Sequence, residues 1–498
     1  MRTPVDTVGE HGIIKDILPN QLEPNAWSDG NNVQMRGGAV HSVNGYDEHL
    51  GTPTVSPTYI INNEDYWLYG GAAAIYSCDD DGTNHTDRSN GTYTSGDWNG
   101  TVLGSIPIFT NNTEVPQAWI SGANFVDLTN WPASTTCKLI RTFGSYLIAL
   151  DITETGTRNE KLVRWSHPAD AGSVPSSWDY TVDTNRSGRT ELSEAAGDIK
   201  DGLTLGGEFL IYTEGSVWRM VPVTNKYVFQ IQKVFGDFGV IAENCVADIG
   251  GRHAVFSNGD IFIHDGYKKQ SIIHSSLKEW LFQQIDPDNK GNCFVVANNN
   301  KSEVMFCYPE LGYTYPNKAF VWNWRTNETG LSDLPDLIYA TSGKVIGSAD
   351  TWDGDSNTWD SDTTQWNELV TSATGQSIVG VAANKLYTLD VGNSANGSDM
   401  VSFVAKEDTM ISPGVNMLTA IRPKVVSSGT PINIYVSRKF SLEASPKWYG
   451  PYTFDPDTQR KVDLRISGRY FGFRFRYVGK LKWKLSSYEL EYQPAGDR

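Results

Sequence analysis

The amino-acid sequence predicts an all-β protein: an irregular β-propeller of about six blades with insertions, followed by a small C-terminal antiparallel β-sandwich. Three observations predict this fold class. Short apolar runs alternate with Gly, Asn, Asp, Ser and Thr along most of the 498 residues, a composition typical of strands joined by turns. Six pairs of these runs have the pattern of β-hairpins. Only one short segment, residues 276–285, has apolar residues at helical spacing.

The candidate hairpins all lie before residue 391. In one of them Asn258-Gly259 separates two apolar runs, and an Asn-Gly pair is the strongest short hairpin signal. Because each propeller blade is a small sheet, the number of hairpins and the chain length favour a propeller. Their uneven spacing, without Gly-His and Trp-Asp signatures, argues against a WD40 array. The hairpins are expected at 64–78, 145–165, 208–220, 253–264, 303–324 and 377–390.

The chain is predicted to divide into a propeller with an N-terminal extension and insertions, residues 1–414, and a sandwich-like domain, residues 415–498. The second domain is indicated by closely spaced strand candidates with alternating polarity. These candidates are 421–426, 432–437, 447–454, 461–466, 472–478 and 483–492.

A turn-rich stretch near the N-terminus, residues 21–46, ends in a predicted hairpin. Two apolar runs flank Gly37-Gly38, and Trp27 precedes them as a potential anchor. We expect this segment to supply a strand that closes a blade.

The charge is distributed unevenly along the chain. From Asn416 to the C-terminus there are 15 Lys and Arg but 7 Asp and Glu, a net charge of +8. The remainder carries 26 basic and 51 acidic residues, a net charge of −25 within the total of −17. An asymmetry of this size indicates two surfaces with different partners.

Several classes of protein are disfavoured by what the sequence lacks. No apolar run approaches the ~18 residues of a membrane span, and the N-terminus has no apolar core for a secretory signal. Five cysteines at wide, unpatterned spacings do not suggest a disulfide framework or a zinc site. We therefore expect buried, reduced thiols, synthesis in a cytoplasm and no membrane span.

A tryptophan repeat is the most unusual local feature. Trp352, Trp359 and Trp366 recur every seven residues, and an Asp follows each of the first two. Turn-forming residues between them are incompatible with a helix, so we expect consecutive turns whose indoles pack inward. The alternative is sugar stacking or calcium binding by the Asp-rich loops. The stretch departs from the Asp-box of sialidase propellers, because Asp355 stands where that motif has Gly.

The C-terminal segment alternates basic and apolar residues. Because the period of a strand is two, the basic residues should share one face and the apolar residues the other. If Gly479 makes a tight turn, the two basic rows lie side by side and need a negative partner. That partner could be an acidic neighbouring subunit, another protein or nucleic-acid phosphate, or the face could simply be solvated. The basic residues are Arg474, Arg476, Lys480, Lys482 and Lys484.

A catalytic constellation is not evident. The sequence has no HExxH, G-x-S-x-G, P-loop or CxxC motif. Two acidic pairs, Asp362 with Glu368 and Glu407 with Asp408, have the residue types of a glycosidase. In such an acid-rich chain we expect them to be solvated charges, and we expect neither an enzyme nor a cofactor.

Several segments, in a consistent order over most of the chain, together resemble one family: the nozzle, or tail-tubular, proteins of short-tailed bacteriophages. The N-terminal segment contains the motif residues Trp27, Asp29, Gly30 and Asn32. The closing run at 466–492 also resembles the end of such proteins. The other matching segments are 18–46, 105–119, 162–179, 202–220, 258–272 and 352–366.

This resemblance implies a propeller-based structural subunit of the virion, six copies of which form a ring below the head–tail adaptor. Such a ring retains packaged DNA and conducts it during ejection. The implied partners are the adaptor, tail-fibre or tail-tip proteins, and genomic double-stranded DNA that passes without specific binding. We expect the acid-rich propeller to face the lumen, because acidic walls repel phosphate, and the basic domain to dock onto neighbouring tail proteins.

Two functions of other classes remain open. One is a carbohydrate-binding or -cleaving propeller that acts as a receptor-binding tail component. The Trp residues of the repeat and its Asp-rich loops favour this function. The other is a secreted bacterial adhesin, but the missing signal sequence argues against it.

Overall fold

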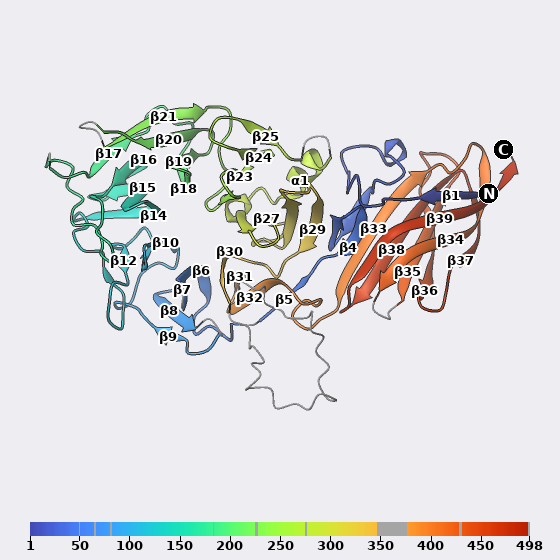
Figure 1. The fold of residues 1–498 in the computed structure, drawn as a ribbon, viewed down its shortest axis with the longest axis horizontal. Coiled ribbons are helices and arrows are strands. Elements are labelled where there is room, and N and C mark those ends of the chain that lie inside the picture. The colour runs from blue at the N-terminus through green and yellow to red at the C-terminus, as the bar shows by residue number, and fades with distance from the viewer. Residues whose placement is uncertain are drawn as a thin grey trace.

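A computed structural model describes residues 1–48, 50–63, 66–79, 82–182, 184–224, 228–273, 276–345, 376–427 and 431–496. A ring of small sheets forms one body, on the left of Figure 1, and two packed sheets form a second body on the right. Both chain ends lie at the far edge of the second body (Figure 1).

The first body is a β-propeller, as predicted. Six antiparallel sheets of four strands and the first four strands of a larger sheet make seven blades in the described part of the chain, against the expected six or so. The first strand of each blade is innermost, and the inner strands of successive blades contact one another around a closed ring. The innermost strand of each blade is therefore flanked by the innermost strands of the two neighbouring blades.

The strands of blades 1 to 4 follow one another along the chain. Blade 1 consists of β6 (Pro57–Asn63), β7 (Tyr66–Gly71), β8 (Ala74–Asp79) and β9 (Thr86–Asp87). Blade 2 consists of β10 (Asn99–Leu103), β11 (Ile106–Thr110), β12 (Gln117–Ala118) and β13 (Val126–Asp127). Blade 3 consists of β14 (Thr135–Phe143), β15 (Tyr146–Glu154), β16 (Thr157–Trp165) and β17 (Gly188–Glu191). Blade 4 consists of β18 (Ile199–Leu205), β19 (Glu208–Thr213), β20 (Val217–Pro222) and β21 (Phe229–Phe235).

Blades 5 to 7 complete the ring. Blade 5 consists of β22 (Val246–Asp248), β23 (His253–Ser257), β24 (Asp260–His264) and β25 (Lys269–Ser271). Blade 6 consists of β26 (Phe294–Asn298), β27 (Glu303–Tyr308), β28 (Lys318–Asn323) and β29 (Thr329–Asp333). Blade 7 consists of β30 (Tyr339–Lys344), β31 (Gln376–Ala382), β32 (Lys385–Val391) and the N-terminal β5 (Gly45–Asp47). The helix α1 (Lys278–Gln284), at the predicted place, and the 3-10 turn η2 (Lys290–Asn292) connect blades 5 and 6.

All six predicted hairpins are confirmed, and each is the central strand pair of a blade. The blade without a predicted hairpin is blade 2. Its third and fourth strands have only two residues each, too few for an alternating pattern to be recognised in the sequence.

The N-terminal segment closes the propeller, as expected. Tyr46 of β5 pairs with Leu389 of β32, so the last blade contains strands from both ends of the ring. A side chain at Gly45 would collide with the backbone of Ser394, which leaves room only for glycine. The ring is thus held shut by hydrogen bonds between segments more than three hundred residues apart.

The second body is a sandwich of two sheets. One consists of β2 (Asp29–Asn31), β33 (Met400–Thr409), β38 (Tyr470–Gly479), β35 (Ile432–Lys439) and β36 (Lys447–Phe454). The other consists of β1 (Arg2–Val5), β3 (Val33–Arg36), β4 (Ala39–Ser42), β39 (Trp483–Gly496), β34 (Val415–Ser427) and β37 (Val462–Gly468), and it continues into blade 6. The 3-10 turn η1 (Pro19–Gln21) precedes β2.

The sandwich contains all six predicted C-terminal strands, but the predicted division into 1–414 and 415–498 is wrong. β33 lies before residue 415, and β1 to β4 come from the N-terminus, yet all five pair within the sandwich. The physical reason is that a sandwich needs partners for every buried strand, and these are supplied by segments distant in sequence.

The two basic rows do not lie side by side, which corrects a second expectation. β38 pairs with β33 and β35, whereas β39 pairs with β34, β4 and β1. The rings of Phe473 and Phe475 lie 6.0 and 5.3 Å from that of Tyr488 across the sandwich. Because the apolar faces of the two strands meet, Arg474 and Lys484 face outward from opposite sides of the sandwich.

A buried chain of hydrogen bonds joins blades 4 and 5. The Tyr212 hydroxyl lies 2.6 Å from Nδ1 of His253 and 2.8 Å from Nε2 of His264. His253 Nε2 faces the carbonyl of Thr204, and His264 Nδ1 accepts from the amide of Gly266. These partners require His264 to donate to Tyr212 and Tyr212 to donate to His253, so both imidazoles are neutral.

Acid should weaken the propeller through these two histidines. Burial lowers the pKa of His253 to about 4 and that of His264 to about 3. The unfolded chain therefore takes up their protons first, so their contribution is complete above pH ~6.5 and is lost as the pH falls. We expect a loss of about 1.4 kcal/mol per histidine for each pH unit below that value.

Urea unfolding at pH 7 and pH 5.5 measures this slope. Since carboxylates also respond to acid, the matched control is His253→Gln/His264→Gln, in which neither side chain titrates. An equally steep loss of stability in this variant would show that the histidines do not contribute.

Candidate functional site: the junction and the charged surfaces

The hairpin of β3 and β4 joins the two bodies into one continuous sheet. Gln34 of β3 pairs with Gly330 in blade 6, and His41 of β4 pairs with Lys484 in the sandwich. The predicted turn at Gly37-Gly38 connects the two strands, and both glycines have positive φ. Backbone hydrogen bonds thus run from the propeller through the N-terminal hairpin into the sandwich.

Asn32, one of the motif residues, lies at the corner where β2 leaves one sheet and β3 enters the other. Its φ is 52°, a conformation that asparagine tolerates better than most residues. Its amide nitrogen donates to Asp333 Oδ2 at 2.7 Å and to the carbonyl of Val401 at 2.8 Å, and its oxygen accepts from the Asp333 amide at 2.7 Å. One buried side chain therefore connects blade 6 with the five-stranded sheet of the sandwich.

The other motif residues fix the entry of the chain into this corner. Trp27 is 1% exposed and packs against Phe475 and Tyr488 in the sandwich core. Asp29 forms an ion pair with Lys15 at 2.6 Å. Gly30 is buried where a Cβ would lie 2.8 Å from Ile13. The motif is therefore structural: it builds the junction.

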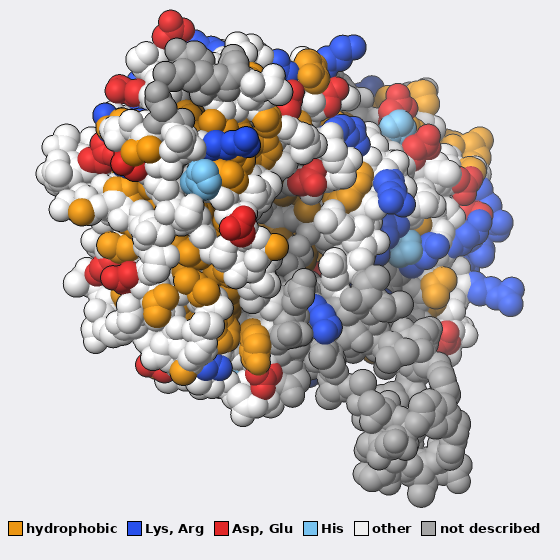
Figure 2. Space-filling view, turned by 60° about the vertical axis from the view of Figure 1, so that its left-hand side comes forward, with side chains coloured by type: hydrophobic (Ala, Val, Ile, Leu, Met, Phe, Trp, Pro, Cys, Tyr) orange, Lys and Arg blue, Asp and Glu red, His pale blue; other side chains and the backbone are white. Residues whose placement is uncertain are grey.

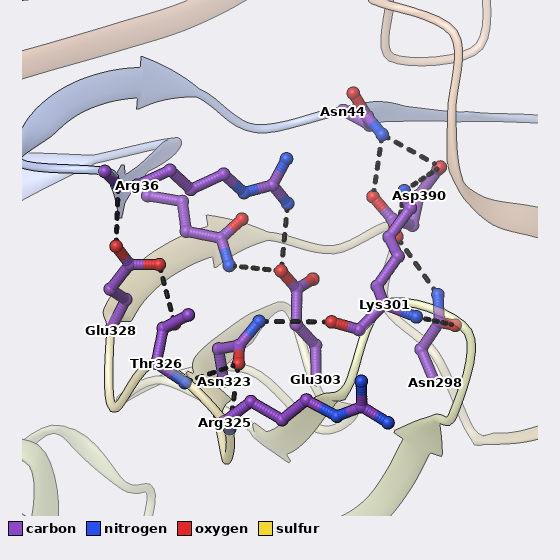
Figure 3. A network of polar contacts seen from close by, with 12 residues as sticks. Arg36, Asn44, Asn298, Lys301, Glu303, Asn323, Arg325, Thr326, Glu328 and Asp390 are labelled. Atoms are coloured by element: carbon purple, nitrogen blue, oxygen red, sulfur yellow. Dashed lines mark hydrogen bonds and ion pairs between the residues drawn. The ribbon is translucent and has the colours of Figure 1, made fainter.

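A network of polar side chains surrounds the hairpin (Figure 3). Glu303 of blade 6 is 5% exposed and accepts from Gln34 at 2.7 Å and from Arg36 at 3.0 Å. Glu328 accepts from the amide of Gly37 at 2.6 Å. Carboxylates of one body thus hold donors of the connecting hairpin, and charge-assisted bonds of this kind are stronger than neutral ones.

The same network extends to blade 7. Asp390 accepts from Lys301 at 2.6 Å, from Asn298 at 3.2 Å and from Asn44 at 2.9 Å (Figure 3). Lys301 and Asn298 belong to blade 6, and Asn44 precedes the closing strand β5. The closure of the ring and the attachment of the sandwich therefore share one set of contacts.

The axis of the propeller is filled by a buried ion pair. Arg141 of β14 lies 2.8 Å from Asp201 of β18, and their side chains are 11% and 4% exposed. Arg141 also donates to Asn244 Oδ1 at 3.1 Å, and the Asn244 amide donates to Asp201 at 3.1 Å. Innermost strands of different blades are thus tied together at the centre.

The space left on the axis is small. It has a volume of about 280 Å³ and is lined by all seven innermost strands. That is at the lower limit of small-ligand pockets, which leaves no room for a DNA duplex. Through the described residues, no duplex can pass along the axis of one propeller.

The boundary found by strand pairing preserves the charge asymmetry. Residues 45–391, the propeller, carry 22 Lys and Arg against 43 Asp and Glu, a net charge of −21. The remaining residues, which form the sandwich and junction, carry 19 against 15, a net charge of +4. Figure 2 shows Lys and Arg side chains gathered on the right of the molecule.

The five predicted basic residues occupy three locations. Arg474 and Arg476 lie on the outer face of the five-stranded sheet, and Lys484 lies on the outer face of the other sheet. Lys480 and Lys482 are exposed in the turn between them. The structure therefore does not bring them together into a single basic face.

The remaining sequence candidates fall partly outside the described residues. Trp352, Trp359 and Trp366, like Asp362 and Glu368, lie outside the described residues. Asp408 is held in an ion pair with Lys439 at 2.7 Å, and the backbone amide of the adjacent Glu407 binds Ser28.

The cysteines and the other side-chain types that bind metals form no special site among the described residues. All five cysteines are buried thiols, as expected. Over the described ranges, His, Cys, Asp and Glu side chains form no group suited to a metal ion, and no helix has the length and apolar character that crossing a membrane requires.

Comparisons with known proteins found no matching protein-family model and no matching curated protein. A functionally unknown protein from Desulfotomaculum acetoxidans DSM 771 is similar with a TM-score of 0.36 at 10% identity, over 55% of this chain and 83% of that one. YCF48 bound to a D1 peptide gives 0.37 at 10% identity, over 70% and 99%. The computationally designed Ika8 protein gives 0.35 at 8% identity, over 69% and 99%. Such a likeness carries no functional argument, and the propeller assignment follows from the strand pairing above.

Sequence reasoning missed the residues that hold the two bodies together. Gln34, Glu303, Asp333 and Asp390 are ordinary polar residues in the sequence, and Arg141 with Asp201 are sixty positions apart. Arg141 stands in a strand of mixed polarity that also contains Lys138 and several threonines, so no local pattern marked it as a buried charge.

Proposed function

We propose that this chain is a structural virion protein, a subunit of a ring-shaped nozzle in the tail of a short-tailed bacteriophage. The observation that carries the proposal is the rigid coupling of an acidic propeller to a basic sandwich through the segment that resembles the nozzle family. Its motif residues form the junction itself, which suits a structural role rather than a catalytic one.

A nozzle must let DNA slide without adhering. Each phosphate neutralised by Lys or Arg adds salt-dependent affinity, whereas an acidic wall repels the duplex. Because the axis of the single propeller is filled, the passage in this proposal lies between subunits, with the propellers forming its wall. The sandwich would contact neighbouring subunits or the head–tail adaptor.

Electron microscopy of the purified protein, alone and with its adaptor, tests the proposal. We expect rings, six subunits in each, with a bore wide enough for a DNA duplex and with no retention of duplex DNA at physiological salt. Strict monomers even in the presence of the adaptor would contradict it. A glycan array and a hydrolysis screen should both be negative, since a positive result would favour the receptor-binding propeller instead.

A further inference from the structure

The outer face of the five-stranded sheet has the composition of a protein-binding surface. We call it the arginine face; it comprises Val401, Phe403, Trp448, Arg474, Arg476 and Val478. The residues between them in β38, such as Phe473 and Phe475, are fully buried, so period two directs the members of the face outward. Val401 and Val478, which pair with each other, are 36% and 40% exposed.

On this face Arg474 is held by aromatic rings, and it attracts the carboxylate of Glu407 without forming a close ion pair with it. The guanidinium of Arg474 lies 4.8 Å from the ring of Trp448 and 5.4 Å from that of Phe403. In the part of the chain that the structure describes, neither Arg474 nor Arg476 has an ion-pair partner. Arginine and aromatic residues are enriched at protein interfaces, and the exposed valines add apolar area beside them.

A surface of opposite charge surrounds α1 on the propeller. We call it the helix patch; it comprises Leu18, Glu279, Asp288, Glu310, Leu311 and Tyr313. Its three segments are held together, because the Leu311 amide donates to Gln284 and the Glu279 amide to Asp16, both at 2.9 Å. Leu18, Leu311 and Tyr313 are 63%, 55% and 46% exposed.

The acidic residues of the helix patch are likewise outside close ion pairs, although Lys278 and Lys290 lie in the same segments. Within the described ranges, none of Glu279, Asp288 and Glu310 forms an ion pair. Among the described residues, one surface thus carries arginines outside close ion pairs and another carries carboxylates outside close ion pairs, so the two have complementary charge.

We propose that the arginine face of one copy of this chain docks onto the helix patch of a second copy. The exposed aliphatic and aromatic groups supply an apolar centre, and the arginines and carboxylates fix the orientation. This inference rests on the proposed function, since it names the contact through which the subunits of the nozzle recognise one another.

Charge reversal with rescue tests the contact by sedimentation velocity. Arg474→Glu/Arg476→Glu should raise the dissociation constant of self-association on the order of a hundredfold, and Glu279→Lys/Asp288→Lys should do the same. A mixture of the two variants should associate again, because the reversed face meets the reversed patch. Arg460→Glu/Arg465→Glu, which changes the net charge equally at exposed positions elsewhere on the sandwich, should associate like the unmodified protein.

The rescue separates a contact from misfolding, since unfolded variants would not recover on mixing. If the arginine reversal leaves the assembly unchanged, or if the mixture does not recover, the docking contact is overturned while the nozzle proposal stands. If the unmodified protein does not self-associate at all, the contact is overturned as well, and the adaptor experiment decides separately on the nozzle.

Discussion

Arg141→Ala should lower the free energy of unfolding of the propeller by about 3–5 kcal/mol, because it leaves a buried charge without its partner. Asp201 is 3% exposed at the centre of the ring. It would keep its bonds from the amides of Gly202 and Asn244 but lose the guanidinium. The effect should extend over several blades, since the pair joins blades 3 and 4 and reaches Asn244 before blade 5.

Urea unfolding followed by circular dichroism measures this loss. The matched control is Arg141→Met/Asp201→Leu, which removes both charges and fills the space with apolar groups. Such replacements are often neutral or stabilising, so the double variant should regain most of the stability lost in the single one. A single variant as stable as the unmodified protein would mean that the ion pair does not hold the centre of the ring.

Trp27→Ala should destabilise the sandwich by about 3–5 kcal/mol, the usual cost of removing a large aromatic side chain from a core. Trp27 is 1% exposed, and its ring lies 6.0 Å from that of Phe475 and 6.1 Å from that of Tyr488. Its indole nitrogen also donates to the carbonyl of Val8. The substitution therefore removes the contact that holds the N-terminal segment against both sheets.

The same unfolding measurement distinguishes packing from hydrogen bonding at this position. Trp27→Phe keeps most of the buried apolar surface but leaves the Val8 carbonyl without its donor, which should cost about 1–3 kcal/mol. Trp448→Ala is the external control, because its half-exposed ring lies on the outer face of the sandwich. If Trp27→Ala were no more disruptive than Trp448→Ala, Trp27 would not anchor the junction.

Much of the propeller could be predicted from local signals. Most central hairpins have two strands of five to nine residues joined by a tight turn, as in His253–Ser257 and Asp260–His264 around Asn258-Gly259. Alternation and turn chemistry act within a dozen residues, so the sequence shows them directly. The hairpin of blade 2 was not predicted, because the strands Gln117–Ala118 and Val126–Asp127 are too short to show an alternating pattern.

The candidate sites were predicted only in part. Alternation correctly placed Arg474 and Arg476 on one face of their strand, but the side-by-side arrangement with the lysine row required β38 and β39 to pair with each other. Local sequence could not decide this, because a hairpin and a crossing between two packed sheets need the same alternation in each strand. The role of Asn32 was likewise invisible, since both of its partners lie more than three hundred residues away.

The sequence by itself determined the all-β class, the repeated hairpins, the six C-terminal strands of the sandwich and the separation of charge, because each depends on neighbouring residues or on composition. Only the tertiary structure decided the number of blades, the true extent of the sandwich and the arrangement of the basic residues. These depend on which strands pair across long distances. Strand pairing is governed by burial of whole faces and by buried polar partners such as Arg141 with Asp201, and no local pattern specifies it.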